Sequence, residues 1–317
     1  MDIAKIINKV KPDISKITLD LYMSNIKNIH KLVTQSNNIT NLEFLNNPSQ
    51  ILSILSNKKP HTIKNYLVSI LVLLKSDESK NKKLIEKYND EIKKLANKIM
   101  DNYDLNEKSI SQEKNWVELT EIHDLVKKYK EIYNRHKKKQ TLNNNELQDI
   151  QDYLLLSLYS GLYFPPVRND FTDMEIITEN ELKSIDKDKN YLTIMDNDKI
   201  KFIFNKYKTS KKFGTYELPI KSKILTDLIL YWIENNGSDK FLINVKSKKP
   251  FTPNMITKSL NRIFQKNIDK TISTSLIRSI YISDSLKKNL NSKDKKKLAS
   301  DMLHSKSVQE NIYNKID

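Results

Sequence analysis

Apolar residues recur at intervals of three and four positions through the first hundred residues, which is the spacing of one buried face of an α-helix. Two segments show this pattern most clearly, ITLDLYMSNIKNIHKLV at 17–33 and HTIKNYLVSILVLLK at 61–75. Clusters of Asn, Ser and Pro separate the apolar segments and indicate loops. The pattern predicts a bundle of four or five short helices over residues 1–103.

The pattern changes to alternation between apolar and polar positions in the middle of the chain. It does so in NYLTIMD at 190–196, KIKFIFNKY at 199–207 and GTYELPI at 214–220. These stretches are rich in β-branched and aromatic residues, as strands are. Helical spacing precedes them from residue 116 and resumes after residue 221. The sequence therefore predicts a mainly α fold with a small antiparallel β-sheet.

A polar stretch, DLNEKSISQEKN, separates the two patterns and is typical of an interdomain linker. A chain of 317 residues is long enough for two ordinary domains. We predict a helical N-terminal domain at 1–103, a linker at 104–115 and an α+β domain at 116–317.

Composition narrows the kinds of chemistry that this chain could perform. It has no cysteine, which excludes disulfides, zinc–thiolate sites and a cysteine nucleophile. Its net charge of +16 favours a polyanionic partner such as nucleic acid. The abundance of Lys, Asn and Ile indicates an A/T-rich genome, such as that of a virus or mobile element, which accounts for part of this charge.

That bias makes arginine informative, because the chain has only four: Arg135, Arg168, Arg262 and Arg278. An arginine retained in such a composition is a candidate for a role that lysine cannot fill, such as gripping two phosphate oxygens at once. We expect about half of the four to have such a role.

No signal peptide or membrane segment is evident in the sequence. The longest apolar run, 68–74, is far below the roughly 20 residues that span a bilayer. We expect a soluble protein without membrane partners, located inside the cell wherever its DNA is.

Five positions in the second predicted domain stand out when they are considered together. The first follows a very apolar helix, which Pro165 and Pro166 are expected to end. The second lies between two predicted strands, the third near the start of a helix, the fourth at a helix end, and the fifth nine residues later. They are Arg168, Lys208, Arg278, His304 and Tyr313.

This ordered set resembles the catalytic residues of the tyrosine recombinases, the phage-integrase family of DNA breaking-rejoining enzymes. The family has an Arg after a helix, a Lys in a β-hairpin, His-x-x-Arg, His or Trp, and a Tyr nine residues further on. LHSKSVQENIY reproduces the last spacing. The resemblance covers roughly 112–317, and residues 1–103 resemble the family's core-binding domain more loosely. One position departs from the pattern, since Ser275 stands where the family has the first His.

The resemblance implies a metal-independent and ATP-independent strand transferase that needs no cofactor. Tyr313 would be the nucleophile, and Arg168, Arg278 and His304 would hold the phosphate. Lys208 would protonate the leaving 5′ oxygen, with Lys206 and Lys211 as substitutes. Ser275 is a possible phosphate contact through its hydroxyl, and Asp170 could orient Arg168. The partners would be double-stranded DNA and further copies of the chain, since such recombinases usually work as tetramers.

Two other functions stay open at this point. A type IB topoisomerase uses the same chemistry to relax supercoils, but the compact viral examples have a mostly β N-terminal domain, whereas residues 1–103 have a helical pattern. A non-catalytic DNA-binding relative would explain Ser275, although it would not explain why both arginines and Tyr313 are retained. Integration, excision and resolution are not distinguished by the sequence.

Overall fold

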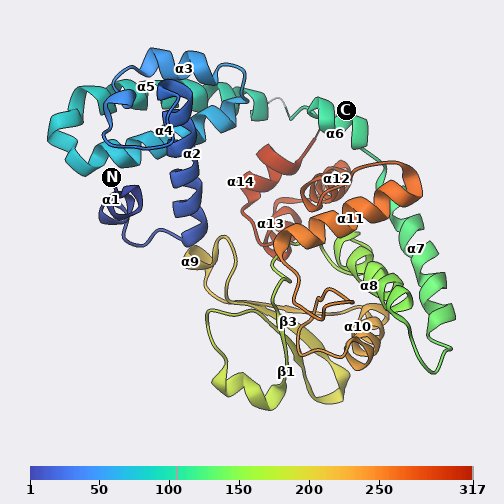
Figure 1. Cartoon of the computed structure of the whole chain (residues 1–317). Helices are drawn as coiled ribbons and strands as arrows, with labels where there is room; N and C mark the ends of the chain where they lie inside the picture. The colour runs from blue at the N-terminus through green and yellow to red at the C-terminus, as the bar shows by residue number, and fades with distance from the viewer. Residues whose placement is uncertain (105, 316–317) are drawn as a thin grey trace. The chain divides into compact units, whose positions relative to one another are not determined.

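The computed structural model describes residues 1–104 and 106–315, apart from the side chains of 102–104 and 197. The chain divides into two compact units, Met1–Leu105 and Asn106–Asp317. The fold is mainly α with one small four-stranded sheet, as the hydrophobic pattern predicts (Figure 1). The second half of the predicted linker forms a short helix, α6 (Ile110–Asn115).

The first unit is wholly helical over its described residues. Its longest helix, α5, has 27 residues and exceeds the short helices that the sequence predicts. Its helices are α1 (Ile3–Val10), α2 (Lys16–Thr34), α3 (Pro48–Leu55), α4 (Pro60–Leu74) and α5 (Glu78–Asp104), with 3-10 turns η1 (Glu43–Leu45) and η2 (Lys75–Asp77).

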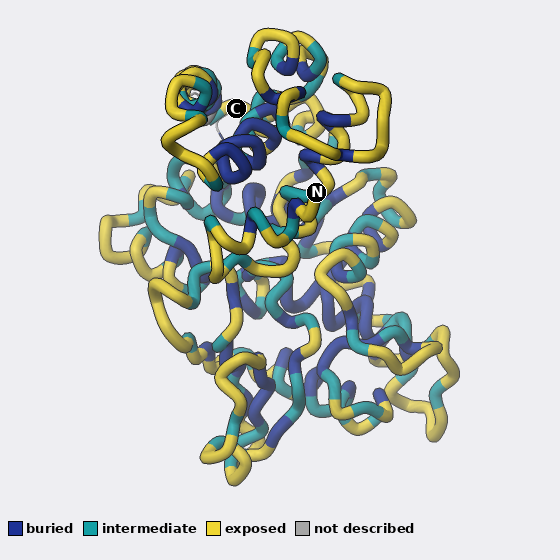
Figure 2. Tube along the Cα trace, turned by 60° about the vertical axis from the view of Figure 1, so that its left-hand side comes forward, coloured by how far each residue is buried: buried dark blue, intermediate teal, exposed yellow. Residues whose placement is uncertain are grey.

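Helix α4 forms the centre of the first unit and packs against α1, α2 and α5. Its C-terminal half, from Ser69 to Leu74, is buried on every side (Figure 2). Pro60 occupies the first turn, where its fixed φ suits the helix and its missing N–H leaves no hydrogen bond unmade. This arrangement explains why the most apolar run of the chain is a core helix.

The second unit packs helices against one sheet. Its long helices are α7 (Leu119–His136), α8 (Asn144–Tyr159), α10 (Lys223–Asn236), α11 (Pro253–Ile268) and α12 (Thr274–Lys287). Shorter ones are α9 (Ser210–Phe213), α13 (Ser292–Asp301), α14 (Lys306–Val308) and the 3-10 turns η3 (Glu179–Ser184) and η4 (Asp196–Asp198), with a π-helical turn η5 (Gln309–Tyr313) at the end.

The sheet has the strand order β1-β2-β3-β4. Strands β2 (Tyr191–Ile194), β3 (Ile200–Phe204) and β4 (Tyr216–Pro219) pair antiparallel, at the three positions that the sequence predicts. A further strand, β1 (Glu175–Thr178), pairs parallel with β2, so the sheet is mixed. The sequence does not indicate β1, because its residues, EIIT, do not alternate between apolar and polar positions.

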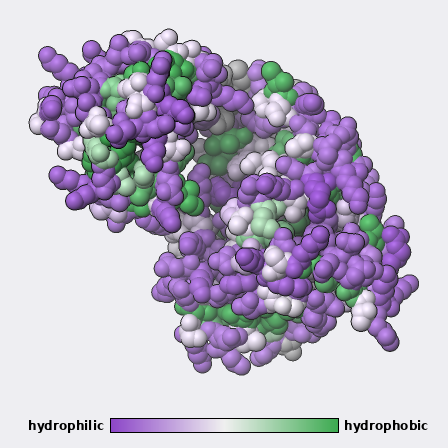
Figure 3. All heavy atoms as spheres, viewed as in Figure 1, coloured by the Kyte–Doolittle hydropathy of each residue, from purple (hydrophilic) through white to green (hydrophobic). Residues whose placement is uncertain are grey.

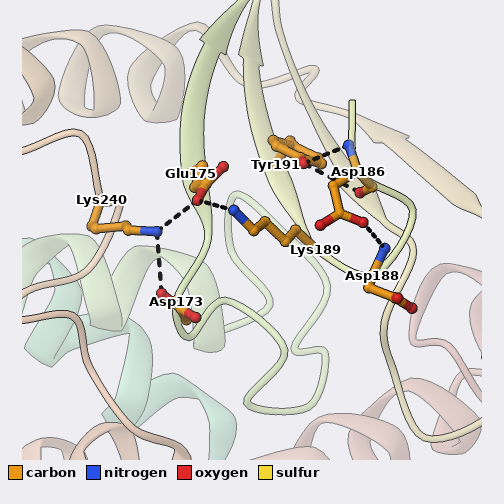
Figure 4. Close-up of polar contacts among 7 residues, drawn as sticks. All are labelled: Asp173, Glu175, Asp186, Asp188, Lys189, Tyr191 and Lys240. Atoms are coloured by element: carbon orange, nitrogen blue, oxygen red, sulfur yellow. Dashed lines mark hydrogen bonds and ion pairs between the residues drawn. The ribbon is translucent and has the colours of Figure 1, made fainter. Parts of the chain in front are cut away.

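The outer edge of β1 is covered by the segment after α10. The backbone of Ile176 donates to Asp239, and Phe241 donates to Met174. Lys240 reinforces this edge with ion pairs at 3.2 Å to Asp173 and 2.8 Å to Glu175, and Lys189 joins Glu175 from the other side (Figure 4). The edge strand therefore has its backbone groups paired and is protected from pairing with another chain.

Aromatic side chains fill the space between the sheet and the helices. Phe171 lies at the middle of this cluster, with ring centroids 4.9 Å from Phe202, 5.7 Å from Phe204 and 6.1 Å from Phe241. Trp232 on α10 is fully buried and donates to the Phe241 carbonyl at 2.7 Å. This core fixes the segment that carries Arg168, because Phe171 lies three residues after it.

Helix α8 ends earlier than the sequence predicts. Its last residue is Tyr159, and the chain turns at Gly161, where φ is +75°, so Pro165 and Pro166 do not end the helix. A Cβ at Gly161 would lie 2.2 Å from ring atoms of Tyr281. Glycine is required here because of both the left-handed backbone and the close approach of α12.

The surface turned to the viewer in Figure 3 is mostly hydrophilic, with scattered apolar patches. Among the described residues, no helix is long and apolar enough to cross a membrane. The same residues contain no group of three or more His, Cys, Asp or Glu side chains that could hold a metal ion.

Candidate active site

Arg168 is held in place through its backbone and its side chain. Its carbonyl accepts a hydrogen bond of 3.1 Å from the hydroxyl of Tyr159, a fully buried residue at the end of α8. Its guanidinium donates to the carbonyl of Leu303 at 2.6 Å, 135 positions along the chain. Arg168, whose side chain is half-buried, thus connects the end of α8 to the segment after α13.

His304 is positioned by the way in which α13 ends. The backbone of Leu303 donates to Ser300 and that of His304 donates to Ala299, which together form a Schellman cap. Leu303 occupies the left-handed position of this cap with φ +57°, where glycine is usual. Ser305 then caps α14, since its hydroxyl accepts from the backbone of Val308 at 3.3 Å. Two helix caps therefore fix the histidine between them.

Arg278 is 1% exposed and lies on the inner face of α12. Its guanidinium donates to the carbonyls of Pro166 at 2.9 Å and Met302 at 3.3 Å, and to Nδ1 of His304 at 2.8 Å. Its Nε–H has no hydrogen-bond partner among the described residues. Burial lowers the pKa of Arg278, although the nearby Tyr313 opposes that effect. The group stays charged, because the unperturbed pKa of arginine is so high.

The contact with Arg278 defines the protonation of His304. A guanidinium can only donate, so Nδ1 must be unprotonated, and the neutral ring then carries its proton on Nε2. Burial, Arg278 and Arg168 lower the pKa of His304 to about 3, so the ring is neutral at pH 7. Nε2 has no hydrogen-bond partner among the described residues, although Gln309 lies near enough to raise the pKa slightly. His304 therefore presents a buried and unused donor.

Tyr313 lies against both of these groups. Its ring centroid is 4.7 Å from Cζ of Arg278 and 5.3 Å from the ring of His304. It is the last residue of η5, a π-helical turn that packs on α12. The segment is anchored just beyond it, where the backbone of Lys315 donates to Ser283 at 2.8 Å. Single π turns are frequent at functional sites, because they shift a side chain out of helical register.

Asp170 is a largely buried carboxyl near the two arginines. Burial raises its pKa to about 6, and the positive charges of Arg168 and Arg278 oppose this rise. Its Oδ2 has no hydrogen-bond partner among the described residues, and no direct ion pair joins it to either arginine. It influences the site through its charge.

The candidate lysine is not joined to this cluster. Lys208 is exposed in the turn after β3, and Lys206 and Lys211 are exposed as well. Lys212, on α9, lines a hollow of about 430 Å³ that also borders His304. The sequence did not single out Lys212 among the lysines of this segment, because only the packing of α9 shows which one faces the histidine.

Ser275 lies on the first turn of α12 and is exposed. It is one helical turn before Arg278, yet its neighbour Thr274 is the residue that is buried there. The structure therefore gathers Arg168, Arg278, His304 and Tyr313, with Asp170 beside them, and leaves Lys208 and Ser275 at the surface.

The other two arginines have different surroundings. Arg262 forms an ion pair of 2.6 Å with Asp152, a carboxyl that is 1% exposed. Arg135 is exposed at the end of α7. Of the histidines near them, His123 contacts the Ser160 carbonyl and His136 contacts Asp149. None of these residues joins the cluster around Tyr313.

Comparison with known proteins adds little to this geometry. No protein-family model matches the chain, and no curated protein matches it. A solved structure described as the crystal structure of XerA recombinase aligns over 99% of this chain and 93% of its own, with 10% identity and a TM-score of 0.39. That similarity is too low to establish a relationship, so the functional argument rests on the site itself.

The cluster is suited to stabilising a phosphoryl group that gathers negative charge. Two guanidinium groups and a neutral imidazole N–H can donate to its oxygens from fixed positions, and the phenol ring of Tyr313 lies beside them. Preorganised donors of this kind are worth most where water is excluded, as it is around Arg278.

Proposed function

We propose that this protein is a site-specific DNA recombinase that cleaves and rejoins strands through a covalent 3′-phosphotyrosine at Tyr313. The observation that carries the proposal is a pair of buried donors beside the Tyr313 ring, Nε of Arg278 and Nε2 of His304, which have no hydrogen-bond partner among the residues that the structure describes. Buried polar groups are normally paired, so two unpaired donors around one candidate nucleophile indicate a missing anionic ligand.

The reaction would follow from the placement of these groups. The phenol oxygen of Tyr313 attacks the phosphorus, the phenol proton passes to solvent, and the P–O5′ bond breaks. Arg168, Arg278 and His304 donate to the non-bridging oxygens as their charge increases. The phosphotyrosine keeps the energy of the broken bond, so a 5′ hydroxyl can reverse the step without ATP.

A lysine of the segment between β3 and β4 would protonate the leaving 5′ oxygen. Lys208 is the candidate from the sequence, and it is exposed on a turn. Lys212 is the candidate from the structure, because it borders the same hollow as His304. Both have the flexible four-carbon side chain that this role requires.

Double-stranded DNA would be the substrate, since a chain with a net charge of +16 attracts phosphates over its whole surface. Residues 1–103 would form a core-binding domain and residues 116–317 the catalytic domain. Strand exchange between two duplexes would need several copies of the chain on DNA, and we propose a tetramer. The protein would act inside the cell, where that DNA is.

The test is formation of a covalent adduct. Supercoiled plasmid and nicked duplex are incubated with the protein, the mixture is denatured in SDS, and adducts are separated by electrophoresis. We expect an adduct with the natural protein and none with Tyr313→Phe. Tyr231→Phe serves as the matched control, because Tyr231 packs against Tyr133 on another part of the unit.

The outcomes separate the alternatives. Absence of an adduct on every DNA would contradict cleavage and favour a non-catalytic DNA-binding protein. Relaxation of plasmid by single copies of the chain, without dependence on sequence, would instead indicate a type IB topoisomerase. The helical first unit favours the recombinase.

A further inference from the structure

The lysine-rich run at 293–297 has no place in the proposed reaction, yet one of its members borders the site. The run forms much of α13, and Lys296 lines the hollow of about 430 Å³ beside His304. Two more lysines reach the same hollow from separate elements, Lys212 on α9 and Lys306 at the start of α14. Segments from 212 to 306 therefore bring three cations to one place.

The lining of this hollow is positive. It contains no Asp or Glu among the described residues. Lys306 has a loose contact of 3.7 Å with Glu310, while Lys212 and Lys296 are exposed. A volume near 430 Å³ falls within the range of about 300–1,000 Å³ that is usual for small-molecule sites. The ligand that fits these charges is an anion.

Aromatic rings form another part of the wall. Phe213 is 51% exposed, and Nζ of Lys212 lies 5.3 Å from its ring centroid. Tyr216 is half-buried and hydrogen-bonds to Ser300 at 3.3 Å, which connects β4 to α13. An exposed ring next to cations is the combination that binds an unstacked base together with its phosphate.

We propose that this hollow is a subsite for a single nucleotide of the DNA strand, next to the phosphate that is cleaved. Lys296 and Lys306 hold its phosphate, and its base leaves the helical stack and lies against Phe213. The subsite rests on the proposed function, since its position relative to the cleaved phosphate follows from the role of His304. Its ligand is a nucleotide unit of any sequence, because every base has a face that can stack.

The position explains why the hollow would matter for the reaction. It adjoins His304, so a strand with its phosphate at His304 has its neighbouring nucleotide within reach of α9 and α13. Holding that nucleotide out of the stack fixes the strand on one side of the breaking bond. This would restrain the sugar whose oxygen leaves or attacks, which is how positioning accelerates a reaction between bound groups.

The experiment uses the full chain with Tyr313→Phe, so that no cleavage occurs, and a thymidine hexanucleotide with one internal 2-aminopurine. Stacking on an aromatic ring quenches the fluorescence of this base. We expect quenching on binding, its loss in Phe213→Leu and its retention in Phe213→Tyr. The exposure of Phe213 means that neither change should disturb folding.

The charge part of the proposal has a matched control on the same helix. Lys296 lines this hollow, whereas its neighbour Lys297 lines a different hollow beside Tyr281. We expect Lys296→Gln to weaken hexanucleotide binding about 3- to 10-fold and to reduce the slope of log affinity against log salt by about 0.7. Lys297→Gln removes the same charge and should change affinity less than 2-fold.

Two results would overturn the subsite: unchanged quenching in Phe213→Leu, or equal losses of affinity in the two lysine variants. Failure of the subsite can be distinguished from failure of the proposed cleavage reaction. An adduct at Tyr313 without quenching at Phe213 removes the subsite and leaves the recombinase, whereas quenching without any adduct supports the subsite and removes the cleavage.

Discussion

Two arginines in the second unit have buried partners, and the difference between them separates a structural pair from a site. Arg262 forms an ion pair of 2.6 Å with Asp152, which Gln148 also contacts at 2.9 Å. Arg278 donates to two carbonyls and a neutral histidine, and its Nε–H has no hydrogen-bond partner in the part of the chain that the structure describes. The first charge is neutralised by the protein, whereas the second is buried and lacks a directly bonded anion.

This contrast indicates which of the two arginine charges is available to bind a ligand. A buried ion is costly unless it is paired, so a chain that keeps Arg278 unpaired would be more stable without it. An incoming phosphate would provide the missing counter-charge. The comparison predicts that changes at Arg278 reduce activity and that changes at Arg262 reduce stability.

The largest effect is expected at Arg278. Arg278→Lys keeps a positive charge but loses the planar fork that holds the His304 ring and two carbonyls. We expect the cleavage rate to fall about 10³- to 10⁴-fold, because an arginine that stabilises phosphoryl transfer contributes on this order. Single-turnover adduct formation measures the rate. Arg262→Lys is the control, and an equal loss of rate there would remove the distinction between the two arginines.

The unfolding free energy should show the reverse pattern and depend more on Arg262 than on Arg278. Arg262→Leu leaves Asp152 buried without a cation, which costs about 3–5 kcal/mol of unfolding free energy. Adding Asp152→Asn should recover more than half of this loss, since a neutral amide needs no counter-charge. Urea unfolding measures both variants. A double variant that is as unstable as the single one would show that the loss comes from packing and not from the unpaired charge.

The general acid can be identified with a DNA substrate whose leaving group needs no proton. Lys208→Ala and Lys212→Ala are compared on ordinary DNA, and the acid is expected to lose about 10²- to 10³-fold in cleavage rate. On DNA with a 5′-bridging sulfur, whose thiolate leaves without a proton, that variant should approach the natural rate. The lining of the hollow favours Lys212. If only Lys208→Ala recovers its rate on the sulfur-containing DNA, the general acid is Lys208, as the sequence predicts.

The smallest effect is a pH dependence of stability at Asp170. Its pKa in the folded protein is about 6, against an ordinary value of 3.8 for aspartate. The unfolded chain therefore loses this proton first as pH rises, so unfolding free energy falls between about pH 4 and pH 6, by at most about 3 kcal/mol. Asp170→Asn should remove that fall.

The contribution of His304 to the unfolding free energy changes with pH in the opposite direction. The effect of Asp170 therefore has to be measured as the difference between the natural protein and Asp170→Asn. The pKa of His304, about 3 in the folded protein, lies below the ordinary 6.5 of histidine, so its contribution to stability is present above pH 6.5 and is lost as pH decreases. Unfolding curves of both proteins from pH 4 to pH 8 measure the difference. A constant difference across this range would contradict a raised pKa at Asp170.

Much of the fold could be predicted from local pattern. Periodicity indicated the longer helices of both units and three of the four strands, because apolar residues recur in them at the spacing of a helix or of a strand. The short β1 was missed, and so was the end of α8 at Gly161, where packing against Tyr281 requires a glycine. Both depend on neighbours that are distant in sequence.

The residues of the candidate site also fall into those that the sequence could identify and those that only the structure could. Order, spacing and the scarcity of arginine suggested Arg168, Arg278, His304 and Tyr313, and the structure places these four together. The lysine could not be chosen, since five lysines lie close together in sequence and only the position of α9 distinguishes them. Ser275 also could not be judged from spacing, because helix orientation leaves its side chain exposed.

The sequence by itself determined the helical pattern, the positive charge and the residue types available for chemistry, since these depend only on composition and local spacing. Tertiary structure alone decided the protonation of His304, which follows from its contact with Arg278 across 26 positions. It also decided which buried donors have no partner. The reason is physical: a pKa or an unpaired donor depends on every group within a few ångströms, and most of those groups are distant along the chain.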